Sequence, residues 1–207
     1  LALENSKRPY IVFGPMDKHG PELIDDLKLF LKYYQGSFSC DVTTGFKYYF
    51  GAHKGLIPTL DHPEVLNELE KSNPDLIIHF GHRLTSKHYY KFLEKRMNQD
   101  PQAQIIQICN SHQHEDPGLA FQQRWNLNPS SALKAINVHI KEYSKEYSKE
   151  HNEEHIDSHK VLQKKPLLQL ESMIEKKSQI IDDSPLCYPV MSKVAVENLE
   201  NIHNIFI

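Results

Sequence analysis

Three basic side chains, Lys47, Arg83 and Lys87, fall in stretches that we expect to be loops at the carboxyl ends of strands. In open α/β sheets, ligands collect in the crevice beyond these strand ends. A rim of cationic side chains there gathers anionic groups and orients them. The alternative is that the three side chains are solvated loop charges. Residue type and position alone leave both interpretations open.

A second group of chemically active residues is rich in histidine. The segment 151–155, His-Asn-Glu-Glu-His, matches the H-x-x-E-H pattern of some zinc proteases, and His159 adds a histidine on the same helical face. The segment lies in a low-complexity repeat, so we expect no catalytic zinc there and at most adventitious metal capture. The His-rich segment 112–116 is interpreted in the same way.

Nucleotide binding and nucleophilic catalysis are not favoured by the motifs present. The turn after the first predicted strand, residues 14–20, lacks G-x-G-x-x-G, and Pro15 removes an amide donor from it. The sequence also contains no G-x-S-x-G and no P-loop signature.

The central stretch that positions the basic residues is Pro74 to Phe92. Residues 75–80, Asp-Leu-Ile-Ile-His-Phe, form a short run rich in apolar residues and predict a buried parallel strand. Gly81 allows a sharp turn, and Ser86 is a suitable N-cap for a helix that starts at Lys87 and reaches about residue 95. The unit is therefore strand, tight loop and helix.

The rest of the chain continues this alternation of strands and helices. Further strands are predicted over 8–13, 37–42, 103–109 and 121–127, and further helices over 21–34, 63–71 and 128–140. Residues 43–61 are expected to form one long functional loop. The pattern predicts an α/β fold, doubly wound, with a mainly parallel sheet and helices on both faces.

Composition divides the chain into three parts. We expect an α/β domain over 1–140, a polar helical linker or insertion over 141–184, and a last helix and strand over 185–207. The middle part opens with a charged run, Lys-Glu-Tyr-Ser twice, which predicts an exposed helix outside the core. The sequence lacks an initiator Met and ends on apolar residues, so we expect a fragment of a longer protein.

Charge, cysteine use and hydropathy exclude several classes of protein. Lys plus Arg is 24 against 27 for Asp plus Glu, which gives a net charge of -3, so we expect no nucleic-acid partner. Three widely spaced cysteines without a C-x-x-C pair indicate free thiols in a reducing cytoplasm. No apolar run is long enough to span a membrane, and no signal peptide is recognisable.

Three stretches carry a resemblance to a known family: SKRPYIVFGP, CDVTTGFK and PDLIIHFGHRLTSKHYYKFLEK. They resemble the central domain of 2-succinyl-5-enolpyruvyl-6-hydroxy-3-cyclohexene-1-carboxylate synthases, which are thiamine-diphosphate enzymes of menaquinone biosynthesis. The resemblance extends over about residues 7–140; beyond them, only the helix and strand predicted over 185–207 look like the family's lead-in to its diphosphate-binding domain, which is absent here. Lys87, after Ser86, falls on the family's lysine, and His88 stands where the family sometimes has Arg. Thr44 takes a hydroxyl position of the family, and Lys47 stands where Arg is common, which replaces a bidentate clamp by a point charge.

The resemblance implies a function for the longer protein. Such enzymes have three α/β domains and form dimers or tetramers. The first and third domains bind thiamine diphosphate and Mg²⁺ (or Mn²⁺), and the middle domain lines part of the site for 2-oxoglutarate and isochorismate. This implies substrate-binding roles for Thr44, Lys47, Arg83, Ser86, Lys87 and His88.

What the chain lacks is also informative. It contains no Gly-Asp-Gly stretch of the kind that holds the metal and diphosphate in thiamine enzymes. We therefore expect that this fragment has no catalytic residue, binds no cofactor and is inactive alone. Two alternatives stay open: the central domain of another thiamine-dependent decarboxylase or ligase, and a non-catalytic α/β binding module.

Overall fold

Six parallel strands form one sheet in the part of the chain that the computed structural model describes, namely residues 2–16, 21–34, 36–51, 53–111 and 116–150. The strands are β1 (Pro9–Phe13), β2 (Ser37–Cys40), β3 (Leu56–Ile57), β4 (Leu76–Phe80), β5 (Gln104–Cys109) and β6 (Gln123–Asn126). Their spatial order is β3-β2-β1-β4-β5-β6, so the direction of winding reverses between β1 and β4. The predicted doubly wound, parallel α/β fold is confirmed.

The central strands are buried on both faces, as parallel strands usually are. All five residues of β1 and all five of β4 are buried, and the two strands pair in register from Pro9 opposite Leu76 to Phe13 opposite Phe80. Alternate side chains of β1 serve opposite faces. The ring of Phe13 meets that of Phe30 at 6.4 Å, whereas the ring of Tyr10 meets that of Phe92 at 6.4 Å.

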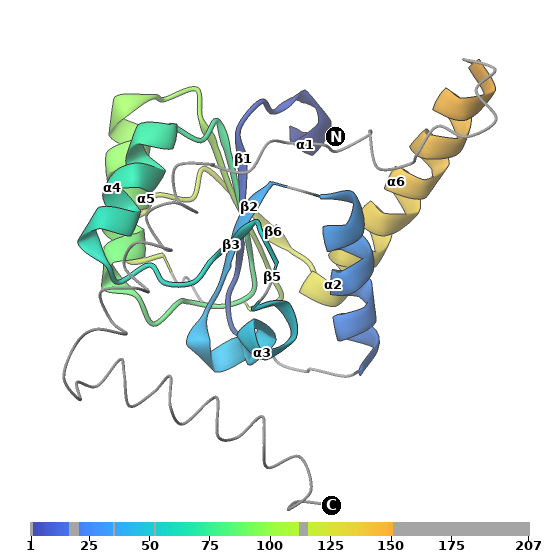
Figure 1. Ribbon diagram of the computed structural model, residues 1–207. Coiled ribbons are helices and arrows are strands. Elements are labelled where there is room, and N and C mark those ends of the chain that lie inside the picture. The colour runs from blue at the N-terminus through green and yellow to red at the C-terminus, as the bar shows by residue number, and fades with distance from the viewer. Residues whose placement is uncertain (1, 17–20, 35, 52, 112–115, 151–207) are drawn as a thin grey trace, which may run out of the picture. The chain divides into compact units, whose positions relative to one another are not determined.

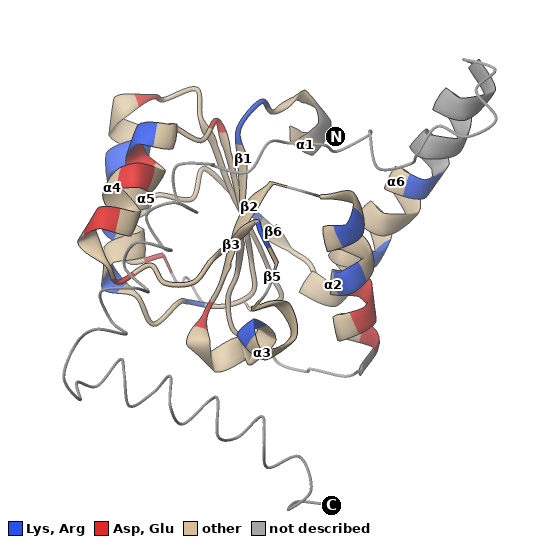
Figure 2. Cartoon of the chain, viewed as in Figure 1, with Lys and Arg blue, Asp and Glu red and all other residues tan. Residues whose placement is uncertain are grey.

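Phe30 and Phe92, the partners of the two β1 rings, belong to helices that cover different faces of the sheet. Helices α2 (Pro21–Tyr33) and α6 (Pro129–Glu150) contact each other on one side, and α4 (Pro63–Ser72) and α5 (Lys87–Gln99) contact each other on the other side (Figure 1). On α2 the acidic residues lie in the first half and the basic residues in the second, whereas α4 is mainly acidic and the neighbouring α5 mainly basic (Figure 2). In the described part of the chain, no helix is long and apolar enough to cross a membrane.

The expectation of one long loop over 43–61 is wrong. This stretch contains most of a 3-10 turn, η1 (Val42–Thr44), together with helix α3 (Phe46–Phe50) and the short strand β3. The helix forms because Phe46 and Phe50, four residues apart, bury their rings in the core. Two aromatic residues of this stretch are therefore core residues.

Smaller differences concern the ends of elements. The strand predicted over 37–42 ends at Cys40 because Asp41 caps the turn that follows. The helix predicted from Lys87 to about residue 95 continues to Gln99. The helix predicted over 128–140 continues into the charged run as far as Glu150, which confirms the helical start of that run. The predictions for residues 151–184 and 185–207, including the 151–159 histidine pattern, lie outside the described residues.

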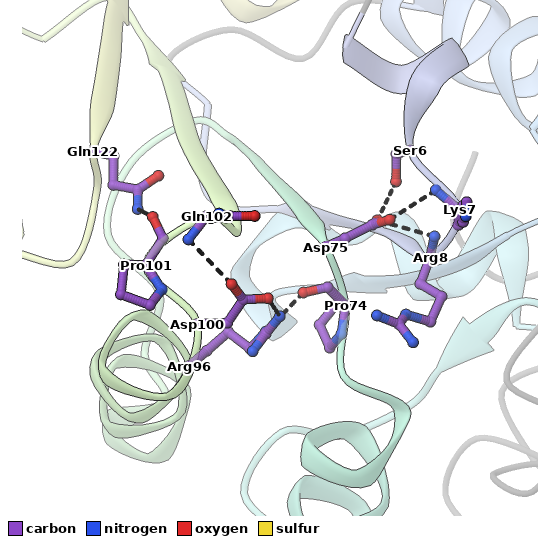
Figure 3. A network of polar contacts seen from close by, with 10 residues as sticks. All are labelled: Ser6, Lys7, Arg8, Pro74, Asp75, Arg96, Asp100, Pro101, Gln102 and Gln122. Atoms are coloured by element: carbon purple, nitrogen blue, oxygen red, sulfur yellow. Dashed lines mark hydrogen bonds and ion pairs between the residues drawn. The ribbon is translucent and has the colours of Figure 1, made fainter.

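The amino ends of the strands are tied together by a polar network (Figure 3). Asp75 accepts hydrogen bonds from the amides of Lys7 and Arg8, at 2.8 and 2.9 Å, and from the hydroxyl of Ser6. Arg96, which is 2% exposed, donates to the carbonyl of Pro74 at 2.7 Å and to Asp100 at 2.6 Å. This edge therefore fixes the strands, and the opposite edge carries the candidate site.

Candidate functional site

The loops that leave the carboxyl ends of β2 and β4 meet at one carboxylate, Asp41. Its Oδ1 accepts from the amide and hydroxyl of Thr43, at 2.9 and 2.7 Å. Its Oδ2 accepts from the amide and hydroxyl of Thr85, at 2.8 and 3.0 Å. One side chain thus joins the turn after β2 to the loop before α5.

The surroundings of Asp41 favour its ionised form. Partial burial by itself raises the pKa of this carboxyl, but the hydrogen bonds from Thr43 and Thr85 outweigh it and leave the pKa below its ordinary value. The carboxylate is therefore charged at neutral pH and acts as an acceptor of all four bonds.

Beside Asp41 lies a hollow of about 50 Å³. It is lined by the following residues: Cys40, Asp41, Val42, Lys47, Thr59, Leu60, Asp61, Leu84, Thr85 and Ser86.

The basic group of the hollow is Lys47, which is half-buried. Burial lowers the pKa of Lys47, and the nearby Cys40, Asp41 and Asp61 act in the opposite direction. Burial also raises the pKa of the Cys40 thiol to about 12, so that this sulfur is neutral at physiological pH. The hollow combines one ammonium group with two carboxyl groups, which makes its charge mixed.

Of the six residues predicted to bind substrate, the structure brings Lys47 and Ser86 together in this hollow. The Ser86 hydroxyl caps α5 by accepting from the Tyr89 amide at 3.3 Å, as expected, and donates to the Leu60 carbonyl at 3.4 Å. Thr44 is buried beside the hollow and does not line it; its hydroxyl donates to the Asp41 carbonyl at 2.8 Å. The Ser86 and Thr44 hydroxyls therefore hold the local backbone in place.

The other three predicted residues lie outside the hollow. Lys87 and His88 are exposed in the first turn of α5. Arg83 is also exposed, and its guanidinium lies over the Tyr90 ring at 5.9 Å from the ring centre. These side chains sit at the carboxyl edge, where the helix N-terminus adds partial positive charge.

At the switch point between β1 and β4, the two loops contact each other through their backbones. The amide of His82 donates to the carbonyl of Pro15 at 2.7 Å. Gly81 has φ of 93°, and a Cβ there would come within 2.3 Å of the same Pro15 oxygen. A Cβ on Gly14 would come within 2.4 Å of the His82 carbonyl. The backbone atoms at this crevice are therefore engaged with each other.

A buried polar cluster lies beneath this contact, and the sequence analysis did not identify it. His79 is fully buried; its Nε2 is 2.8 Å from the His82 carbonyl and its Nδ1 is 3.2 Å from the Tyr89 hydroxyl. Because a carbonyl can only accept, Nε2 carries a proton, and in the neutral imidazole Nδ1 then accepts from the Tyr89 hydroxyl. Gln107, opposite His79 in the sheet, donates to the Gly81 carbonyl at 3.2 Å. The available signal was a His and a Gln inside otherwise apolar strands.

Asp41 and Thr85 were also missing from the predicted site. The signal for Asp41 was an acidic residue directly after a strand and two residues before a threonine, the pattern of a side-chain-capped turn. Thr85 carries no comparable signal, because its partner is 44 residues away in the chain.

Metal ligands do not gather in the described ranges, where no group of three or more His, Cys, Asp or Glu residues could hold an ion. The His-rich segment 112–115 falls in one of the gaps between those ranges.

Comparison with known proteins gives one distant relationship. No protein-family profile matches the chain. Over 140 residues, which is 68% of this chain, it is 30% identical to 2-succinyl-5-enolpyruvyl-6-hydroxy-3-cyclohexene-1-carboxylate synthase of Syntrophus aciditrophicus (strain SB). The matched region is 23% of the length of that synthase. The chain is therefore similar, at a distance, to about a quarter of a synthase of that name.

Proposed function

We propose that the chain is the central domain of a longer thiamine-diphosphate-dependent synthase of menaquinone biosynthesis. The reaction would decarboxylate 2-oxoglutarate and add the resulting carbanion to isochorismate. The observation that carries this proposal is the 30% identity to a synthase of that name over 140 residues. The doubly wound fold supports it, because this architecture places ligands at the carboxyl edge of the sheet.

The charges at that edge agree with the chemistry of the two substrates. Both are polyanions, so that a site for them needs cationic groups that hold carboxylates in place. Lys87 and Arg83 are exposed at this edge, and Lys47 lies in the adjoining hollow. In the proposal, Lys87 contacts a substrate carboxylate, Arg83 adds positive charge beside it, and His88 and Lys47 lie at the same edge.

The cofactor would be bound by other parts of the longer protein. The sequence contains no Gly-Asp-Gly stretch, and the hollow of about 50 Å³ is too small for thiamine diphosphate. We therefore propose that the described residues do not hold thiamine diphosphate or its Mg²⁺ (or Mn²⁺), and we assign no step of the reaction on the cofactor to them. The assembled synthase would be a cytoplasmic homodimer or homotetramer.

The test is the activity of the full-length protein supplied with thiamine diphosphate, Mg²⁺, 2-oxoglutarate and isochorismate. The proposal expects release of carbon dioxide together with consumption of isochorismate and the mass of the condensed product. Decarboxylation of a 2-oxo acid without consumption of isochorismate would instead indicate another thiamine-dependent decarboxylase or ligase. No decarboxylation of any 2-oxo acid would favour the non-catalytic binding module.

Lys87→Ala tests the assigned contact within that enzyme. We expect kcat/KM for one of the two substrates to fall roughly 10- to 100-fold, the loss that corresponds to one charge-assisted hydrogen bond of about 1.5–3 kcal/mol. The matched control is Lys91→Ala, which removes an exposed lysine of the same helix one turn later. Equal kinetics for both variants would remove Lys87 from the site.

A further inference from the structure

Asp41 holds the two segments that carry the candidate substrate-binding lysines. We propose that Asp41 is a positioning residue, which fixes the loop that leads to Lys87 against the turn that leads to Lys47. The role in catalysis rests on the proposed function, whereas the mechanical link rests on the geometry alone.

The anchor side of this link is rigid. The Asp41 amide donates to the Phe13 carbonyl at 2.8 Å, which ties Asp41 to the end of β1. Its carbonyl accepts from the amide of Thr44 at 3.1 Å and from the hydroxyl of Thr44 at 2.8 Å. The whole residue is 7% exposed. The carboxylate therefore starts from a backbone that is held by the sheet and by the turn.

The far side of the link is a surface loop. Thr85 is exposed, yet its amide and its hydroxyl both bind Oδ2 of Asp41. Two bonds from one residue to one oxygen fix the orientation of that residue as well as its position. Ser86, the N-cap of α5, comes next, and Lys87 follows it as the first residue of the helix. Loss of the Thr85 bonds would therefore free the segment that sets the position of Lys87.

Only an ionised carboxylate fits this arrangement. Two oxygens receive two donors each, with no donor required from Asp41 itself. An asparagine would keep one acceptor oxygen and would turn its NH₂ group toward the other two donors. The lowered pKa of Asp41 agrees with this, because the four bonds favour the charged form.

The first measurement is amide hydrogen exchange in the full-length protein, compared between wild type and Asp41→Asn. We expect exchange at Thr85 to accelerate about tenfold or more, since a loop held by few bonds opens locally. Asp61→Asn is the matched control: it removes a carboxylate from the same hollow, but the Thr85 bonds go to Asp41. If Asp41→Asn does not fold, Thr85→Val tests the same link. It deletes only the hydroxyl bond at an exposed position, and a smaller increase in exchange is expected.

The second measurement is a double-mutant cycle on kcat/KM. We expect Asp41→Asn to lower kcat/KM about tenfold, mainly through KM, because displaced binding groups lose orientation. In a Lys87→Ala background, Asp41→Asn should lower kcat/KM less than about twofold, since the side chain that Asp41 positions has been removed. Full multiplication of the two losses would show that Asp41 does not act through Lys87.

The two measurements test separate parts of the proposal. Unchanged exchange at Thr85 in Asp41→Asn, or in Thr85→Val where Asp41→Asn does not fold, would overturn the mechanical link whatever the enzyme does. If the full-length protein makes no condensed product, the proposed function fails and with it the positioning role, while the exchange result still decides whether Asp41 joins the two loops.

Discussion

Gly81 is the position where a single added methyl group is expected to do the most damage. Its φ is 93°, a value that L-residues rarely adopt, and a Cβ would lie 2.3 Å from the Pro15 carbonyl oxygen and 2.9 Å from that of Gly14. Both atoms belong to the backbone of the β1 loop, so they cannot rotate away as a flexible side chain would.

The expected loss has two parts. The backbone conformation costs a residue with a Cβ about 1–2 kcal/mol. Displacing the neighbouring backbone adds about 1–3 kcal/mol, as insertion of a group into a packed region usually does. Gly81→Ala should therefore lower the free energy of unfolding by about 2–5 kcal/mol, which is a large fraction of the stability of an ordinary domain.

Two other glycines separate these contributions. Gly45 also has a positive φ, 67°, but a Cβ there meets nothing within 4 Å, so Gly45→Ala should cost only the 1–2 kcal/mol of backbone strain. Gly118 lacks a positive φ, and its nearest neighbour would be 3.9 Å away. Gly118→Ala should stabilise the fold by about 0.4–1 kcal/mol because it restricts the unfolded chain.

The assay is urea unfolding followed by circular dichroism and by the fluorescence of Trp125, the single tryptophan. With a slope of about 2 kcal/mol per molar urea, Gly81→Ala should move the midpoint down by roughly 1–2.5 M. If Gly81→Ala and Gly45→Ala lose the same stability within about 0.5 kcal/mol, the close approach to Pro15 contributes nothing and the argument is refuted.

Two more predictions concern the core and the pH dependence of stability. Leu27→Ala, at a fully buried position of α2, should cost about 2–5 kcal/mol in urea unfolding, while Val138→Ala, 54% exposed, should stay within about 0.5 kcal/mol. For Asp75, partial burial by itself raises the pKa, but hydrogen bonds from the Ser6 hydroxyl and from the amides of Lys7 and Arg8 outweigh the effect of burial and lower the pKa. The stabilisation by ionised Asp75 is therefore complete above the ordinary pKa of about 3.9 and is lost as the pH falls through the lowered pKa. The urea midpoint of the wild type should fall between pH 5 and pH 3, and Asp75→Asn should make this fall smaller. An equal fall in both proteins would contradict the prediction.

Much of the fold could be predicted because its strongest signals are local. The run Leu76–Phe80, bounded by Pro74 and Gly81, is short and apolar, and Ser86 announces the helix after it. The stretch 43–61 could not be predicted, because its helix depends on where Phe46 and Phe50 find the core, which is tertiary information. Strand ends were displaced for a similar reason: Asp41 caps a turn where the pattern alone would extend the strand.

The candidate site was predictable in part. Lys47 and Lys87 lie near the carboxyl edge as expected, although they belong to helices α3 and α5 and not to loops; their contact with substrate stays a prediction. The sequence could not show that Asp41 reaches Thr85, because the bond joins loops from two separate strands and depends on the order in which those strands lie in the sheet. It also could not show that His79 and Gln107 face each other, since their register is set by pairing between strands.

The backbone contact between the β1 and β4 loops has a consequence for how this protein can evolve. Gly14, Pro15 and Gly81 constrain one another: a larger residue at either glycine collides with the opposite loop. One substitution would not open this crevice to a phosphate group, because the His82 amide can be freed only if the Pro15 carbonyl that it binds also moves. Exposed side chains at this edge, in contrast, can be replaced without a change in the backbone beneath them.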